Sequence, residues 1–150
     1  MKKGRGAVRS RPRVGRDDCR VMFSLMQAGQ AVERRLEEAL EEVGLSPAKF
    51  GVLTHLVRAG APLSLGECAE RMTCVRSNIT QLIDRLEADG LVRRVDDPDD
   101  RRGVRAMVTP LGMERQAAGA QHVGRAQKEF AKTLSEADQA VLTRVLSAIR

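Results

Sequence analysis

The chain has 150 residues, the length of one domain or two small ones, with 42% hydrophobic and 31% charged residues. No stretch approaches the ~20 apolar residues of a membrane span, and an aromatic content of 2% argues against proteins that stack unpaired bases. The three cysteines (Cys19, Cys68 and Cys74) lack the paired spacing of a zinc site or disulfide framework. We therefore expect a cytoplasmic protein without a cofactor, a metal or a membrane segment.

The net charge of +6 is concentrated at the N-terminus, which suggests an anionic partner. Residues 1–16 contain seven basic side chains and no acid, whereas the other 134 residues carry 19 basic and 20 acidic ones. Because this segment is rich in glycine and arginine and lacks an apolar period, we expect a disordered basic tail. It is an arm that touches DNA phosphates, a solubilising extension or the result of a misplaced start codon.

Two helices are predicted in the first 60 residues. Apolar residues recur every three or four positions from about Asp18 to Val43, which indicates a long amphipathic helix ended by Gly44. Ser46 followed by proline is typical of a helix start, and the second helix should stop at Gly60. Residues 61–63 then form a short extended segment, which we count as a strand.

The next segment has the pattern of a helix-turn-helix. Ser64 and Glu67 have the spacing of a capping box and should open a short helix. After a turn at residues 73–74, a second helix is predicted from about Val75 to Asp89, with Gly90 as its cap. Two short helices joined by such a turn are typical of DNA-binding modules.

A β-hairpin and two further helices complete the chain. Residues 91–95 and 104–109 alternate and are rich in β-formers, and the segment 96–103 between them is polar and turn-rich. A long helix should run from Pro110 to about Lys132, and Ser135 should cap the last one.

These elements predict a mainly α fold, a winged helix-turn-helix with helices at both ends. We expect a basic tail at 1–16 and one domain at 17–150. The winged module should span 46–110, with a DNA-reading helix at about 75–89 and a wing at about 91–109. The terminal helices, 17–43 and 111–150, carry more apolar surface than one small domain needs, which favours a two-fold dimer.

The outer face of helix 75–89 is the candidate DNA-reading surface. Its apolar stripe must face the core, so short polar and long basic side chains lie on the other side, of the types that hydrogen-bond base edges and phosphates. These are Arg76, Ser77, Asn78, Thr80, Gln81 and Arg85. The alternative is an ordinary solvated helix face.

The tip of the predicted wing supplies a second candidate contact. Arg102 can enter a minor groove while Asp100 hydrogen-bonds either its side chain or a turn amide, and Arg101 lies beside them. The acids Asp96, Asp97 and Asp99 should point away or offset Arg93, Arg94 and Arg101. A solvated turn with a surface ion pair is the alternative.

At these residues the sequence resembles the MarR (multiple antibiotic resistance regulator) family of bacterial transcription factors. The match is sharpest over 82–112, "LIDRLEADGLVRRVDDPDDRRGVRAMVTPLG", and looser over 64–80. The resemblance implies a homodimer that binds a pseudo-palindromic double-stranded operator, usually as a repressor. It also implies that Ser77, Asn78, Thr80, Gln81 and Arg85 contact the major groove or the backbone, and Arg102, oriented by Asp100, the minor groove.

The resemblance further implies a signal, a small ligand or an oxidation, that releases the DNA. Effectors of the family commonly sit between the terminal helices and the winged module, which gives five candidates: Met22, Met26, Phe50, His55 and Arg115. Cys19 and Cys74 are redox candidates, whereas Cys68 falls on an inner helix face and should be a core residue.

Other functions are less well supported by the residues. The sequence lacks the phosphate-binding, zinc-hydrolase and nucleophile-elbow motifs of common enzymes, so we expect no catalysis. Two alternatives remain: a non-specific architectural DNA-binding protein without an effector, and a protein–protein adaptor on a winged-helix scaffold.

Overall fold

The computed structural model describes residues 16–72 and 76–149, so the predicted tail and the turn with Cys74 lie outside it, apart from Arg16. The chain divides into two compact units, the first ending at Glu33 and the second beginning at Arg34. In the described residues the first unit is a single helical segment. The second contains all the strands and the other helices.

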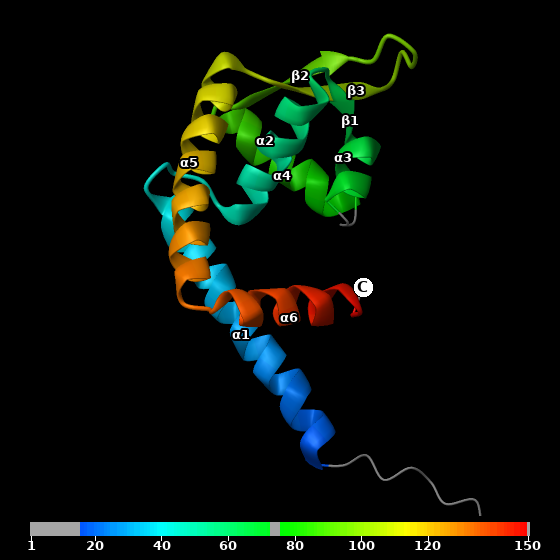
Figure 1. Cartoon of the computed structure of the whole chain (residues 1–150). Helices are drawn as coiled ribbons and strands as arrows, with labels where there is room; N and C mark the ends of the chain where they lie inside the picture. The colour runs from blue at the N-terminus through cyan, green and yellow to red at the C-terminus, as the bar shows by residue number, and fades with distance from the viewer. Residues whose placement is uncertain (1–15, 73–75, 150) are drawn as a thin grey trace, which may run out of the picture. The chain divides into compact units, whose positions relative to one another are not determined.

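The architecture is mainly helical with one small antiparallel sheet, as predicted (Figure 1). The elements, in chain order, are α1 (Arg16–Glu41), α2 (Pro47–Ala59), β1 (Leu63–Ser64), α3 (Leu65–Arg71), α4 (Arg76–Ala88), β2 (Val92–Asp96), β3 (Val104–Val108), α5 (Pro110–Lys132) and α6 (Glu136–Ser147). The first helix begins and ends two residues earlier than predicted. The other ends lie within one or two residues of the predicted positions.

The helix starts follow the side chains that cap them. The Ser46 hydroxyl accepts a hydrogen bond from the Lys49 amide at 3.3 Å, at the start of α2. In α3 the Ser64 hydroxyl accepts from the Glu67 amide at 3.2 Å, and the Glu67 carboxylate accepts from the Ser64 amide at 2.7 Å. This reciprocal pair is the predicted capping box, and it fixes where the helix-turn-helix begins.

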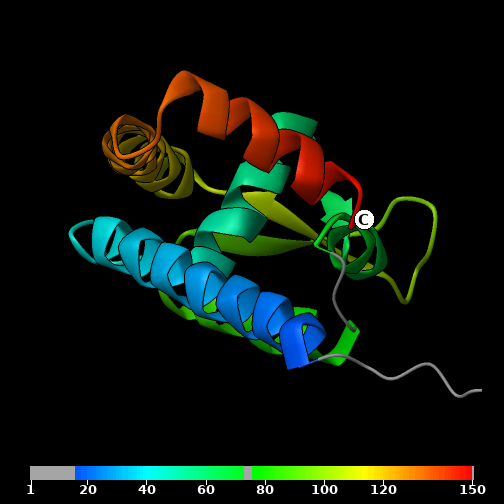
Figure 2. The ribbon, with the colours of Figure 1, turned by 60° about the horizontal axis from the view of Figure 1, so that its bottom comes forward.

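The sheet holds the hairpin against the helix-turn-helix. Its strand order is β1-β3-β2, with Leu63 opposite Ala106 and Val92 opposite Val108. The two-residue β1, directly before α3, therefore pairs with the central strand β3. The loop between β2 and β3 projects beyond the ends of these two strands in both views (Figures 1 and 2).

The core of the second unit lies between α2, α4 and the sheet. Leu53 and Leu56 of α2 and Ile79, Ile83 and Leu86 of α4 are at most 1% exposed. Since these α4 residues recur at helical spacing, they turn the opposite face of α4 outward.

Large apolar side chains are exposed on both terminal helices. On α1, in the first unit, they include Val21, Met22, Phe23, Leu25 and Met26. On α6 of the second unit they include Val141, Leu142, Val145 and Leu146. Apolar surface of this extent is typical of an interaction site. In the described ranges, no helix combines the length and apolar character needed to cross a membrane.

Candidate nucleic-acid interface

The outward face of α4 carries polar side chains in one line. Asn78, Gln81 and Arg85 are exposed and follow each other at spacings of three and four residues, so they share one side of the helix. Thr80 is half-buried and has contacts within the protein. Arg76 and Ser77 lie in the first turn of α4, but their side chains are outside the described part.

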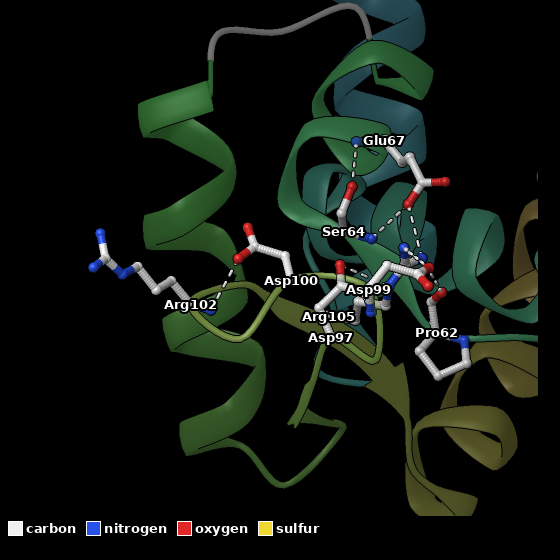
Figure 3. A network of polar contacts seen from close by, with 8 residues as sticks. All are labelled: Pro62, Ser64, Glu67, Asp97, Asp99, Asp100, Arg102 and Arg105. Carbon is white, nitrogen blue, oxygen red and sulfur yellow. Dashed lines mark hydrogen bonds and ion pairs between the residues drawn. The ribbon is translucent and has the colours of Figure 1, made fainter.

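The loop at the wing tip is closed by its own hydrogen bonds. The Asp97 amide donates to the Gly103 carbonyl at 3.0 Å, and the Gly103 amide donates to the Asp100 carbonyl at 2.8 Å. The Asp100 carboxylate accepts from the backbone amide of Arg102 at 2.9 Å (Figure 3), so of the two predicted roles of Asp100 the structure selects the turn amide. The side chains of Arg101 and Arg102 are exposed.

Arg94 of β2 is neutralised by α4, which differs from the expected pairing with loop acids. Its guanidinium donates to Asp84 at 2.5 Å and also to Glu87. The hydrogen bond to Asp84 raises the pKa of Arg94 above its ordinary value. Because both carboxylates on the second half of α4 are paired with one arginine, they repel an approaching phosphate less than free acids would.

Arg105 of β3 is the partner of the loop acids. Its Nε lies 2.9 Å from an Asp97 carboxylate oxygen, and its Nη2 lies 4.0 Å from Asp99. The expectation that these acids offset Arg93, Arg94 or Arg101 is therefore wrong for Asp97 and Asp99. Charges that are close in the sequence do not predict an ion pair with a residue on the opposite strand of the hairpin.

The carboxyl groups of this network are held in their charged forms. The backbone amide of Asp99 donates to Asp97 at 3.0 Å and, together with Arg105, lowers the pKa of Asp97. The capping hydrogen bonds from Ser64, followed by the charge of Arg105, lower the pKa of Glu67. Hydrogen bonds to the ionised form have this sign because protonation would weaken them.

These shifts predict a loss of stability in acid. A carboxyl group whose folded-state pKa is depressed stabilises the fold above its unfolded pKa, near 4, and loses that contribution as the pH falls through the folded value. Glu67→Gln should therefore lower the melting temperature at about pH 7 and converge with the parent chain below about pH 3. Thermal unfolding followed by circular dichroism across this range measures the difference.

The matched control is Glu70→Gln, which removes an exposed carboxylate from the same helix. Its unfolding should keep the acid dependence of the parent chain. If the two variants show the same dependence on pH, the capping carboxylate has no special role.

Sequence reasoning missed Arg94 and Arg105 as parts of this surface. Each is a charged residue that is only half-buried within a strand. A basic residue inside an alternating strand was the available signal, but its partners lie up to 43 residues away in the chain.

The effector candidates fall in both units. Met22 and Met26 are exposed on α1 in the first unit. In the second, Phe50 and His55 of α2 are half-buried, and Arg115 of α5 donates to the Val43 carbonyl at 2.8 Å, a contact that supports the turn after α1.

The cysteines divide between described and undescribed positions. Cys68 is buried as predicted, and burial raises the pKa of its thiol, which disfavours the reactive thiolate. Cys19 lies in the first turn of α1, but its side chain, like all of Cys74, is outside the described part. Among residues 16–72 and 76–149, no group of three histidine, cysteine or acidic residues could hold a metal ion.

Comparison with known proteins places this geometry in a family. A MarR family model matches residues 43–103, from the turn after α1 to the last residue of the wing loop. The transcriptional repressor MdtR of Bacillus subtilis is 34% identical over 92 residues, which are 61% of this chain and 59% of MdtR. The transcriptional regulator PrsX of Escherichia coli is 33% identical over 94 residues, 62% of this chain and 57% of PrsX.

A solved structure extends the similarity to most of the fold. A cysteine-to-serine mutant of MarR from E. coli, complexed with operator DNA, has a TM-score of 0.80 at 26% identity and covers 89% of this chain and 95% of that one. The family model, these relatives and this structure together support a winged-helix regulator of the MarR family. Members of the MarR family are transcription regulators and not enzymes. The chain spans about half to three fifths of the length of the curated relatives it matches.

Proposed function

We propose that this chain is a sequence-specific regulator of transcription that binds double-stranded DNA as a homodimer and acts in the cytoplasm as a repressor. In this proposal α4 enters the major groove through Asn78, Gln81 and Arg85, and Arg76, Ser77 and Thr80 also contact the major groove or the backbone. The wing places Arg102 in the adjacent minor groove, beside Arg101. A small ligand or an oxidation event releases the DNA.

One observation carries the proposal. The exposed line on α4 and the exposed arginines of the wing lie on elements joined through one sheet, while nearby acids are paired with Arg94 and Arg105. Side chains that can read bases are thus left outward, and the two arginines offset part of the negative charge beside them. The operator complex of MarR from E. coli supports DNA as the partner.

The exposed apolar residues of α1 and α6 support a homodimer. Each helix would bury this surface against a second copy, and a two-fold dimer would present two reading helices to half-sites about one helical turn apart. The operator should then be an inverted repeat.

Selection from a pool of random double-stranded DNA tests sequence specificity. We expect enrichment of one short inverted repeat, protected in a footprint at two half-sites. Gln81→Ala should weaken binding to this repeat by about tenfold and relax the base preference at one position in each half-site. Fluorescence anisotropy with the selected duplex measures the affinity, and sequencing of the variant's selected pool measures the preference.

Gln121→Ala is the matched control, because it removes the same exposed side chain from α5. Its affinity and selected sequence should equal those of the parent chain. Even protection of DNA without an enriched sequence would instead favour the architectural alternative. The selected duplex also serves to screen small ligands and peroxide for release of the DNA.

A further inference from the structure

Arg105 occupies the centre of the sheet. On β3 it lies opposite Ser64 of β1 on one side and Val95 of β2 on the other. Its side chain is 24% exposed, so much of its length is covered by the protein. Arg105 is therefore the β3 residue that lies opposite the first residue of the capping box on one side and a residue near the end of β2 on the other.

The guanidinium of Arg105 connects three segments of the chain (Figure 3). Its Nη1 donates to the Glu67 carboxylate at 3.3 Å and lies 3.4 Å from the Pro62 carbonyl, at the entrance to α3. Its Nε and Nη2 face Asp97 and Asp99 at the base of the wing loop, at 2.9 and 4.0 Å. The cation therefore binds the start of the helix-turn-helix and the wing at the same time.

Removing the Arg105 guanidinium would leave the carboxylates around it without a positive charge between them. Three carboxylates, Glu67, Asp97 and Asp99, face one guanidinium, and without it their mutual repulsion pushes the loop away from α3. A lysine cannot replace it fully, because a single ammonium group lacks the planar fork that reaches several carboxylates at once.

Hydrogen bonds within the wing loop connect Arg105 to the backbone of Arg102. Asp97, held by Arg105, accepts from the Asp99 amide and closes the loop through its own amide and the Gly103 carbonyl. Asp100 then accepts from the amide of Arg102. A series of short contacts thus runs from the α3 capping box to the backbone of the residue expected in the minor groove.

We propose that Arg105 is a positioning residue for DNA recognition: by joining Glu67 at the start of α3 to Asp97 and Asp99 in the wing, it fixes where Arg102 stands relative to α4. This inference rests on the proposed function. In this inference Arg105 makes no contact with DNA, because its guanidinium faces Glu67, Asp97 and Asp99 within the protein. It acts by restricting the wing loop, so that less conformational freedom is lost when Arg102 binds.

A double-mutant cycle between Arg105 and Arg102 tests the inference on the selected duplex. Arg105→Met keeps the length and apolar stem of the side chain and removes its charge. We expect it to weaken binding by about fivefold to tenfold in the parent chain, and by less than about twofold when Arg102 is already alanine. Arg105→Lys should give an intermediate loss with the same dependence on Arg102.

Arg93→Met is the matched control, because it also removes an exposed arginine, in this case from the neighbouring strand β2. The side chain of Arg93 contacts the sulfur of Met107, and among the described residues it takes no part in the ion pairs of Arg105. Its effect should multiply with that of Arg102→Ala, as expected for independent charges. A merely stabilising role of Arg105 would lower the melting temperature of the variant but would leave its effect on binding independent of Arg102. That independence, or an unchanged affinity, overturns the inference.

Amide hydrogen exchange distinguishes failure of this inference from failure of the proposed function. If the parent chain selects no sequence, the proposed function fails, but the anchoring can still be measured without DNA. Arg105→Met and Arg105→Lys should then speed exchange at the amides of Arg102 and Gly103, both hydrogen-bonded within the loop. Unchanged exchange in a folded variant overturns the anchoring itself.

Discussion

Replacing Gly112 by alanine is expected to destabilise the fold by about 3 kcal/mol or more. A Cβ at this position would lie 2.0 Å from the backbone oxygen of Leu91 and 2.8 Å from a methyl group of Val108. The first clash is with backbone, which cannot rotate out of the way, so α5 would have to shift. Urea unfolding followed by circular dichroism measures the loss.

Gly124→Ala provides the control on the same helix. No atom lies within 4 Å of the Cβ that it would add, so only the higher helix propensity of alanine remains. It should stabilise the chain by up to about 1 kcal/mol. A Gly112→Ala variant as stable as the parent chain would show that α5 does not approach the α4–β2 connection this closely.

Arg102→Ala is expected to weaken binding to the selected duplex by about 1–3 kcal/mol, roughly fivefold to 150-fold, while the fold stays intact. Its side chain is exposed, and the contact that the structure shows for this residue is made by its backbone amide. In a narrow minor groove, where the negative potential is high, a guanidinium gains more than on open backbone. Fluorescence anisotropy gives the affinity, and thermal unfolding gives the stability.

Arg125→Ala tests whether the loss reflects position or charge. It removes another exposed arginine, from the second half of α5, far along that helix from its start at the wing. Its affinity should change by much less. If Arg102→Ala binds as tightly as the parent chain, the wing does not contact DNA.

Local signals predicted the elements well because they act within a few residues. Ser46, Ser64 and Ser135 each accept from an amide three residues on, so the starts of α2, α3 and α6 could be read from the sequence. The apolar spacing of α4 likewise predicted which face is buried, and therefore which face carries Asn78 and Gln81.

Contacts that join distant segments could not be predicted in the same way. Arg94 reaches back to α4, and Arg105 reaches Glu67 across 38 positions, so neither partner could be found from neighbouring charges. The charged residues of the wing can be counted in the sequence, but the register of β1, β3 and β2 determines which of them form ion pairs. The expected pairing of the loop acids failed for this reason.

The close packing at Gly112 has a mechanical consequence for α5. The Thr109 hydroxyl donates to the Gly90 carbonyl at 2.8 Å, and the Thr109 amide donates to that of Leu91 at 3.1 Å, so the start of α5 is clamped to the segment between α4 and β2. From this clamp the helix continues for 23 residues, roughly 35 Å. Because this end of the helix is fixed to that segment, a tilt of α5 as a whole would rotate the end of α4 and the start of β2 together with it.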